Sequence, residues 1–61
     1  MNYTDPVSGF SISQCDYNNH CWISDASGNA RMHLSSTEEL KDEAEAQRII
    51  DWYLNVISTI K

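Results

Sequence analysis

Residues 36–60 read STEELKDEAEAQRIIDWYLNVISTI, and this stretch decides the fold. It contains neither Gly nor Pro, so nothing in it interrupts an α-helix. The segment STEE (36–39) has the pattern of a capping box, in which a Ser oxygen and a Glu carboxylate accept hydrogen bonds from backbone amides at the helix start. The sequence therefore predicts one long C-terminal helix over residues 36–60. The alternative is a helix that begins at Asp42, because DEAE (42–45) can cap in the same way.

The C-terminal half of this helix is apolar around an unusually wide part of its circumference. At about 100° per residue, its apolar side chains span an arc of roughly 200°, about twice the stripe of an ordinary surface helix. We therefore expect an interaction surface with aromatic anchors. The alternative is a fully buried arc, with Tyr3 and Val7 covering one flank. The residues expected at the surface are Ile49, Trp52, Tyr53, Val56, Ile57 and Ile60.

Three short segments before the helix have strand character. FSISQC (10–15) alternates apolar and polar residues, which is the pattern of a half-buried strand. Segments 21–26 and 30–34 follow, separated by the turn sequences DYNNH (16–20) and SGN (27–29). Residues 1–9 show no periodicity and are predicted to be an irregular arm. The sequence thus predicts a single α+β domain over 1–61, with a three-stranded antiparallel β-meander at 10–34 and the helix packed on one sheet face.

The loop lengths predict how the strands pair. A five-residue loop at 16–20 sets Cys15 opposite Cys21, and a three-residue loop at 27–29 sets Trp22 opposite Leu34. A slip of one residue would exchange Trp22 for Ile23 in the core. The predicted core face consists of Phe10, Ile12, Trp22, Ala26, Met32 and Leu34. The opposite face receives Cys15, Cys21, Ile23, His33 and the cross-strand pair of Asp25 and Arg31.

The chain is small and acidic. Its 61 residues form one domain at most, and folds of this size usually gain stability from disulfides, a metal or a partner subunit. A formal net charge of -5 and a pI near 4.5 disfavour binding to nucleic acid or to an anionic membrane surface. We therefore expect a protein partner and a homodimer. The N-terminal residues lack a signal-peptide pattern, so a cytoplasmic location is expected.

Cys15, His20, Cys21 and His33 are the plausible metal ligands. Their spacing differs from the paired-cysteine knuckle of ordinary zinc sites, so no metal and no cofactor is predicted. A zinc-stabilised module and a Cys15–Cys21 disulfide under oxidising conditions stay as alternatives. The sequence has neither a nucleophile elbow nor a Gly-rich phosphate loop. We therefore predict no catalytic residue and no enzymatic activity.

An acidic patch precedes the apolar arc. Charge runs are usually solvated helix faces, and negative charge is favourable near a helix N-terminus. The alternative function is a nucleic-acid mimic, in which carboxylates imitate phosphates and inhibit a nucleic-acid-binding protein. The acidic residues are Glu38, Glu39, Asp42, Glu43 and Glu45.

The order of three strands and a helix, carried by CWI (21–23) through Gly28 to Ala44, resembles the arm-type DNA-binding domains of tyrosine integrases and a class of plant DNA-binding domains. Those domains place a basic sheet face in the major groove. Here Arg31 is the one certain cation of that face, so the resemblance implies topology and not DNA binding. In size and style the chain also resembles short accessory proteins of temperate, lambda-like phages. That resemblance implies a protein that binds and modulates a host protein.

Overall fold

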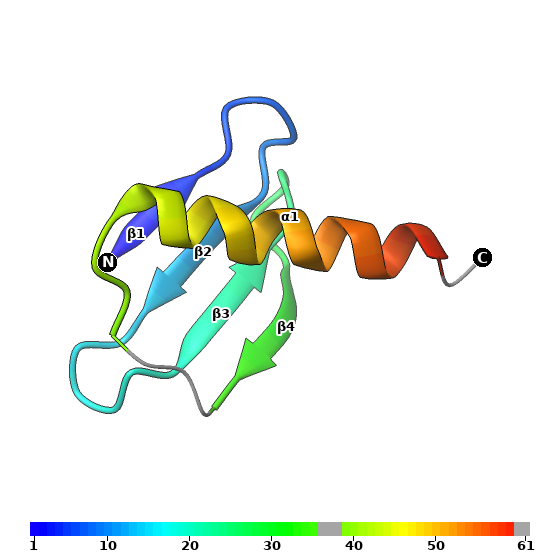
Figure 1. Ribbon diagram of the computed structural model, residues 1–61. Helices are drawn as coiled ribbons and strands as arrows, with labels where there is room; N and C mark the ends of the chain where they lie inside the picture. The colour runs from blue at the N-terminus through cyan, green and yellow to red at the C-terminus, as the bar shows by residue number, and fades with distance from the viewer. Residues whose placement is uncertain (36–38, 60–61) are drawn as a thin grey trace.

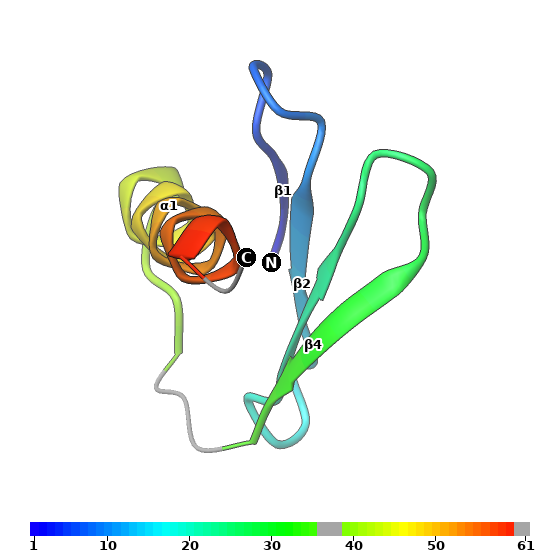
Figure 2. The ribbon, with the colours of Figure 1, turned by 90° about the vertical axis from the view of Figure 1, so that its right-hand side faces the viewer.

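The computed structural model describes residues 1–35 and 39–59, and it has two layers, a β-sheet and one α-helix (Figure 1). The elements are β1 Asn2–Thr4, β2 Ser11–Gln14, β3 Cys21–Ser24, β4 Ala30–Leu34 and α1 Glu43–Thr59. The α+β class is confirmed, but the sheet has four strands instead of three, in the antiparallel order β1-β2-β3-β4. Figure 2 shows the helix on one face of this sheet. In the described ranges, no helix is long and apolar enough to cross a membrane.

The additional strand, β1, lies in the segment that we predicted to be an irregular arm. Its half-buried Tyr3 stands between two exposed residues, and three residues are too few to reveal an alternating pattern in the sequence. The strand pairs with β2 because Asp5 closes the loop between them. The Asp5 carboxylate accepts hydrogen bonds from the Val7 backbone N–H at 3.0 Å and from the Ser8 hydroxyl at 2.8 Å. These bonds, the Val7 bond first, hold the pKa of Asp5 below its ordinary value of 3.8.

The β2–β3 hairpin is closed one residue earlier than predicted. Gln14, and not Cys15, lies opposite Cys21. The reason is that Asn19 takes the left-handed conformation, with a φ of 60°, and its N–H donates to the Cys15 carbonyl at 2.9 Å. The Cys15 N–H in turn donates to the His20 carbonyl at 2.9 Å, so the loop ends at His20.

The β3–β4 hairpin is also shifted by one residue. Trp22 pairs with His33 instead of Leu34. Its loop closes where the Asp25 N–H donates to the Asn29 carbonyl at 2.9 Å, and a β-bulge near the end of β3 then changes the register. Gly28 takes the left-handed conformation in this loop, with a φ of 87°. The register of this hairpin is the one-residue slip that the sequence left open as the alternative.

This shift exchanges the two faces of β3. Cys21 and Ile23, predicted to lie outside, are fully buried, whereas Trp22 is 37% exposed and Ala26 is exposed. The predicted pair of Asp25 with a cation is present, since its carboxylate lies 3.6 Å from the Arg31 guanidinium. Partly buried side chains that include the predicted Phe10, Met32 and Leu34 pack against the core. The core of the described residues consists of Ile12, Cys21, Ile23, Leu40, Ala46, Ile50 and Tyr53.

The helix begins at Glu43, and not near Ser36 as the predicted range of 36–60 required. The alternative start is therefore correct, and the capping box at STEE (36–39) lies partly outside the described residues. Asp42 caps the helix, because its carboxylate accepts the Glu45 N–H at 2.9 Å. The Glu45 carboxylate accepts the Lys41 N–H at 3.3 Å, which completes a reciprocal cap one residue wider than the usual box.

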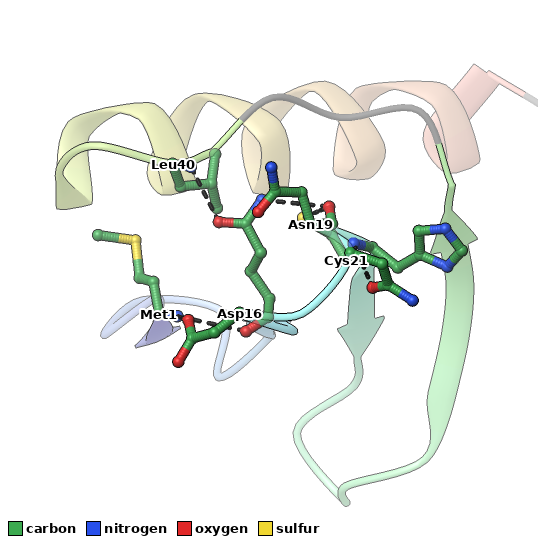
Figure 3. A network of polar contacts seen from close by, with 8 residues as sticks. Met1, Asp16, Asn19, Cys21 and Leu40 are labelled. Atoms are coloured by element: carbon green, nitrogen blue, oxygen red, sulfur yellow. Dashed lines mark hydrogen bonds and ion pairs between the residues drawn. The ribbon is translucent and has the colours of Figure 1, made fainter.

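Two polar contacts tie the helix and its connection to the sheet. The buried Gln14 side chain accepts the Leu40 N–H at 2.9 Å and donates to the Asn19 carbonyl at 3.2 Å (Figure 3). On the other side, the Tyr3 hydroxyl donates to the Gln47 side-chain oxygen. Because the Gln14 side chain accepts a hydrogen bond from Leu40, 26 positions later in the sequence, it fixes the position of the chain just before the helix.

Candidate interaction site

Two adjacent stripes of α1 face the sheet and its open side. The first contains Ala46, Ile50 and Tyr53, which are the buried residues of the helix. The second contains Glu45, Arg48, Ile49 and Trp52, at the spacing i, i+3, i+4 and i+7 that places side chains on one helix face. One stripe is enough to pack a helix on a sheet, so the second stripe needs another explanation.

The second stripe lines an open, mostly apolar pocket of about 380 Å³, which we call the α1–β4 pocket. Trp52 is 47% exposed, although it is one of the largest apolar side chains of the protein. The helix provides four of the lining residues, the end of β4 provides one, and the connection between them provides one. The lining residues are Leu34, Leu40, Glu45, Arg48, Ile49 and Trp52.

The pocket is open because the helix is not centred on the sheet. The helix packs mainly over β1 and β2, and Figure 2 shows β4 turning away from it. Adjacent strands lie about 4.8 Å apart, so β4 is roughly 10 Å beyond the strand that the helix covers. The inner side chains Met32 and Leu34 of β4 are consequently only half-buried. The C-terminal end of α1 also projects past the sheet in Figure 1.

Two charged residues of opposite sign accompany the apolar lining. Glu45 is half-buried and turned towards the start of the helix, where it accepts the Lys41 N–H. Arg48 is exposed, and within the described residues it forms no ion pair. The rim of the pocket therefore presents one anion and one cation three residues apart on the same helix.

The predicted interaction residues do not form one surface, and Ile49 both lines the pocket and packs against the core. Ile49 and Trp52 line the pocket, and Val56 is half-buried further along the helix. Tyr53 is 6% exposed and its ring lies 6.1 Å from the Phe10 ring, so it belongs to the core. The remaining two predicted residues are Ile57, which packs against the core, and Ile60, which lies outside the described residues.

Three residues of the predicted acidic patch are exposed in the described ranges. Glu39, Asp42 and Glu43 are exposed, whereas Glu45 is turned into the pocket rim and Glu38 lies outside the described residues. Asp42 and Glu45 are also engaged in capping the helix. Carboxylates held by their own backbone are poorly placed to imitate a row of phosphates, so the patch supports the solvated-face interpretation better than mimicry.

Sequence reasoning missed Leu34, Leu40 and Arg48 as pocket residues. Leu40 is buried, because the chain around it is held by Gln14 before the helix begins. The sequence did contain one signal that Leu40 is buried, because it is an isolated Leu between charged residues, just before an Asp that can cap the helix. The contribution of β4 depended on the off-centre helix, which no local pattern reveals.

The four candidate metal ligands are divided between the two faces of the sheet. Cys21 is buried in the core, and its register partner is Gln14 and not Cys15. His20 and His33 meet on the outer face, where His33 Nε2 lies 3.1 Å from His20 Nδ1. Among residues 1–35 and 39–59, no group of three or more His, Cys, Asp or Glu side chains could hold a metal ion.

No protein-family model, curated protein or solved structure matches this chain. The resemblance to phage accessory proteins therefore stays a prediction.

Proposed function

We propose that this protein is a small acidic protein-binding module that forms a homodimer through the α1–β4 pocket and modulates a partner protein. The observation that carries the proposal is the second stripe of α1, which leaves Trp52 47% exposed and Ile49 half-buried beside an open pocket. Clustered exposed apolar side chains mark interaction sites, and Trp is enriched among the residues that dominate binding energy.

A second copy of the chain is the occupant that the rim charges favour. An interface between two identical copies is self-complementary, so each surface must satisfy its own charges on the partner copy. An antiparallel pairing of two α1 helices sets Glu45 opposite Arg48 of the second copy, twice by symmetry. Such a pairing gives Arg48 an anionic partner at the edge of an apolar contact.

The same pairing also arranges the apolar residues favourably. With Glu45 opposite Arg48, the register sets Ile49 level with the small Ala44 of the second copy and brings Trp52 towards the start of that copy's helix, which begins at Glu43.

The size of the molecule is compatible with this interface. A standard protein interface buries about 800 Å² on each partner, which is about a fifth of the 4240 Å² exposed by the described residues. The remaining surface carries most of the negative charge, with a net charge of -5 on each chain. That charge favours a basic surface on the modulated partner.

Sedimentation equilibrium of the unmodified protein, Trp52→Ala and Trp22→Ala, in reducing buffer, tests the proposal. Trp22 is a matched control because it is also a partly exposed Trp but lies on the outer face of the sheet. We expect the unmodified protein and Trp22→Ala to dimerise. Losing a hot-spot Trp costs about 2 kcal/mol or more, so Trp52→Ala should raise the dissociation constant at least roughly 30-fold.

A monomer at high micromolar concentration would contradict the proposal. A dimer that Trp22→Ala disrupts and Trp52→Ala leaves intact would place the interface on the outer sheet face and would equally overturn it. Circular dichroism of each variant shows whether the helix is retained, because Trp52 is not part of the core.

A further inference from the structure

The outer face of the sheet carries a cluster of three rings that the proposed dimer does not use. Trp22 on β3 stacks on His33 of β4, with ring centroids 4.9 Å apart and an interplanar angle of 18°. His20, at the end of the β2–β3 loop, faces His33 with centroids 4.9 Å apart and an angle of 56°. The two imidazoles meet through His20 Nδ1 and His33 Nε2, which are 3.1 Å apart. We call these two residues the His pair.

The separation of the two nitrogens matches that of neighbouring ligands on a transition metal. Bonds of about 2.0–2.1 Å from one ion to both nitrogens would enclose an angle of roughly 95–102° across this separation. That value lies between the right angle of octahedral or square-planar neighbours and the wider tetrahedral angle. An ion can therefore replace the contact between the rings without moving the strands apart.

The backbone holds both imidazoles in place. The His20 N–H donates to the Asn18 side-chain oxygen at 3.1 Å, and the His20 carbonyl accepts the Cys15 N–H at 2.9 Å. His33 lies within β4 and is supported by the Trp22 ring. The preformed arrangement lowers the entropy lost when both rings coordinate one ion.

The outer side of the pair is accessible. His33 is exposed and His20 is half-buried, which leaves space for water molecules as the remaining ligands. The acidic chain, with its net charge of -5, also attracts cations.

We propose that His20 Nδ1 and His33 Nε2 bind one divalent transition-metal ion per chain, of the group that prefers imidazole, such as Zn²⁺, Ni²⁺ or Cu²⁺. Each coordinating nitrogen must present its lone pair to the ion. In the metal-bound state His20 therefore carries its proton on Nε2, and His33 carries its proton on Nδ1. Mg²⁺ prefers oxygen ligands and should not bind here.

Isothermal titration calorimetry with Zn²⁺ and Ni²⁺ tests this site on the full chain, with Mg²⁺ as the control ion. His33→Phe removes the ligand and keeps a ring to stack on Trp22, and His20→Ala removes the other ligand. Each should weaken binding roughly 10-fold or more, because the second imidazole no longer acts as an intramolecular ligand. Cys15→Ser, the matched control for binding by a thiolate, should bind as the unmodified protein does.

A second readout locates the ion. Ni²⁺ is paramagnetic, and an ion at the His pair should broaden the NMR signal of the Trp22 indole N–H far more than that of Trp52. Absence of saturable binding would overturn the proposal. Loss of binding in Cys15→Ser, with retention in His33→Phe, would also overturn it, since the ion would then be held by a cysteine.

Discussion

Replacing Gln14 with Met tests how the connection between β4 and α1 is held to the sheet. Met has nearly the same length and flexibility as Gln, so the substitution removes the polar groups and keeps the volume. In the structure, the Gln14 side chain accepts the buried Leu40 N–H at 2.9 Å and donates to the Asn19 carbonyl at 3.2 Å. Gln14→Met leaves that N–H buried without its acceptor.

The expected loss of stability follows from that unsatisfied N–H. A buried donor left without its acceptor costs about 1–3 kcal/mol. In a domain of about 60 residues, 1 kcal/mol corresponds to roughly 4–8 °C in Tm, so a central loss of about 2 kcal/mol lowers the Tm by roughly 8–16 °C. Ser13→Met is the matched control, because Ser13 is the neighbouring residue of β2 and is exposed. Its effect should stay within about 0.5 kcal/mol.

Thermal and urea unfolding should be followed by circular dichroism, with both substitutions made in the Trp52→Ala background at one protein concentration. This background keeps dimer dissociation out of the measured stability. Amide hydrogen exchange at Leu40 should also become faster in Gln14→Met. If Gln14→Met and Ser13→Met differ by less than about 0.5 kcal/mol, the Gln14 bond does not anchor the connection, and our description of the pocket wall at Leu40 is wrong.

Three further predictions concern the loops and the helix start. Gly9→Ala should destabilise the protein more than Gly28→Ala in urea unfolding. Both glycines have a positive φ, which costs a non-Gly residue about 1–2 kcal/mol. Only at Gly9 would the new Cβ also lie 2.9 Å from the Ala26 Cβ. Equal losses of stability in the two variants would contradict a clash between the new Cβ at Gly9 and Ala26. Asp42→Ala should cost about 1 kcal/mol and reduce helical circular dichroism, because it removes the N-cap; unchanged stability would place the helix start elsewhere. Asp5→Asn should flatten the acid limb of the stability curve. The folded pKa of Asp5 is lowered, so its contribution is present above the ordinary value of 3.8 and is lost as the pH falls through the folded pKa; an unaltered acid limb would refute this.

The sequence predicted the elements better than their pairing. The helix and its wide apolar arc followed from the spacing of Ile49, Ile50, Trp52 and Tyr53, because helical periodicity over many residues is a strong signal. The exchange of Trp22 with Ile23 was recognised as the consequence of a one-residue slip, but the loop lengths favoured the other register. The slip depends on Asn19 taking the left-handed conformation in the first loop and on a β-bulge in the second hairpin, and neither follows from the loop lengths.

The sequence did not predict strand β1 or the α1–β4 pocket, and the reasons differ. β1 has three residues, and a single half-buried Tyr3 gives no period. The pocket depends on where α1 lies relative to β4, which is a tertiary property. Trp52 was predicted at the surface and is 47% exposed, whereas Tyr53 lies on the core stripe because it is one residue, about 100°, further around the helix.

The most direct test of the proposed homodimer is a mixing experiment with Glu45→Arg and Arg48→Glu. In a dimer of either variant alone, charges of the same sign face each other twice across the interface, whereas in the mixed dimer every charge faces one of opposite sign. We predict that each variant sediments as a monomer at concentrations where the unmodified protein is a dimer, and that an equimolar mixture restores the dimer. If both variants dimerise as the unmodified protein does, or if mixing restores nothing although both are folded by circular dichroism, then Glu45 does not face Arg48 of a second copy and the proposed dimer is wrong.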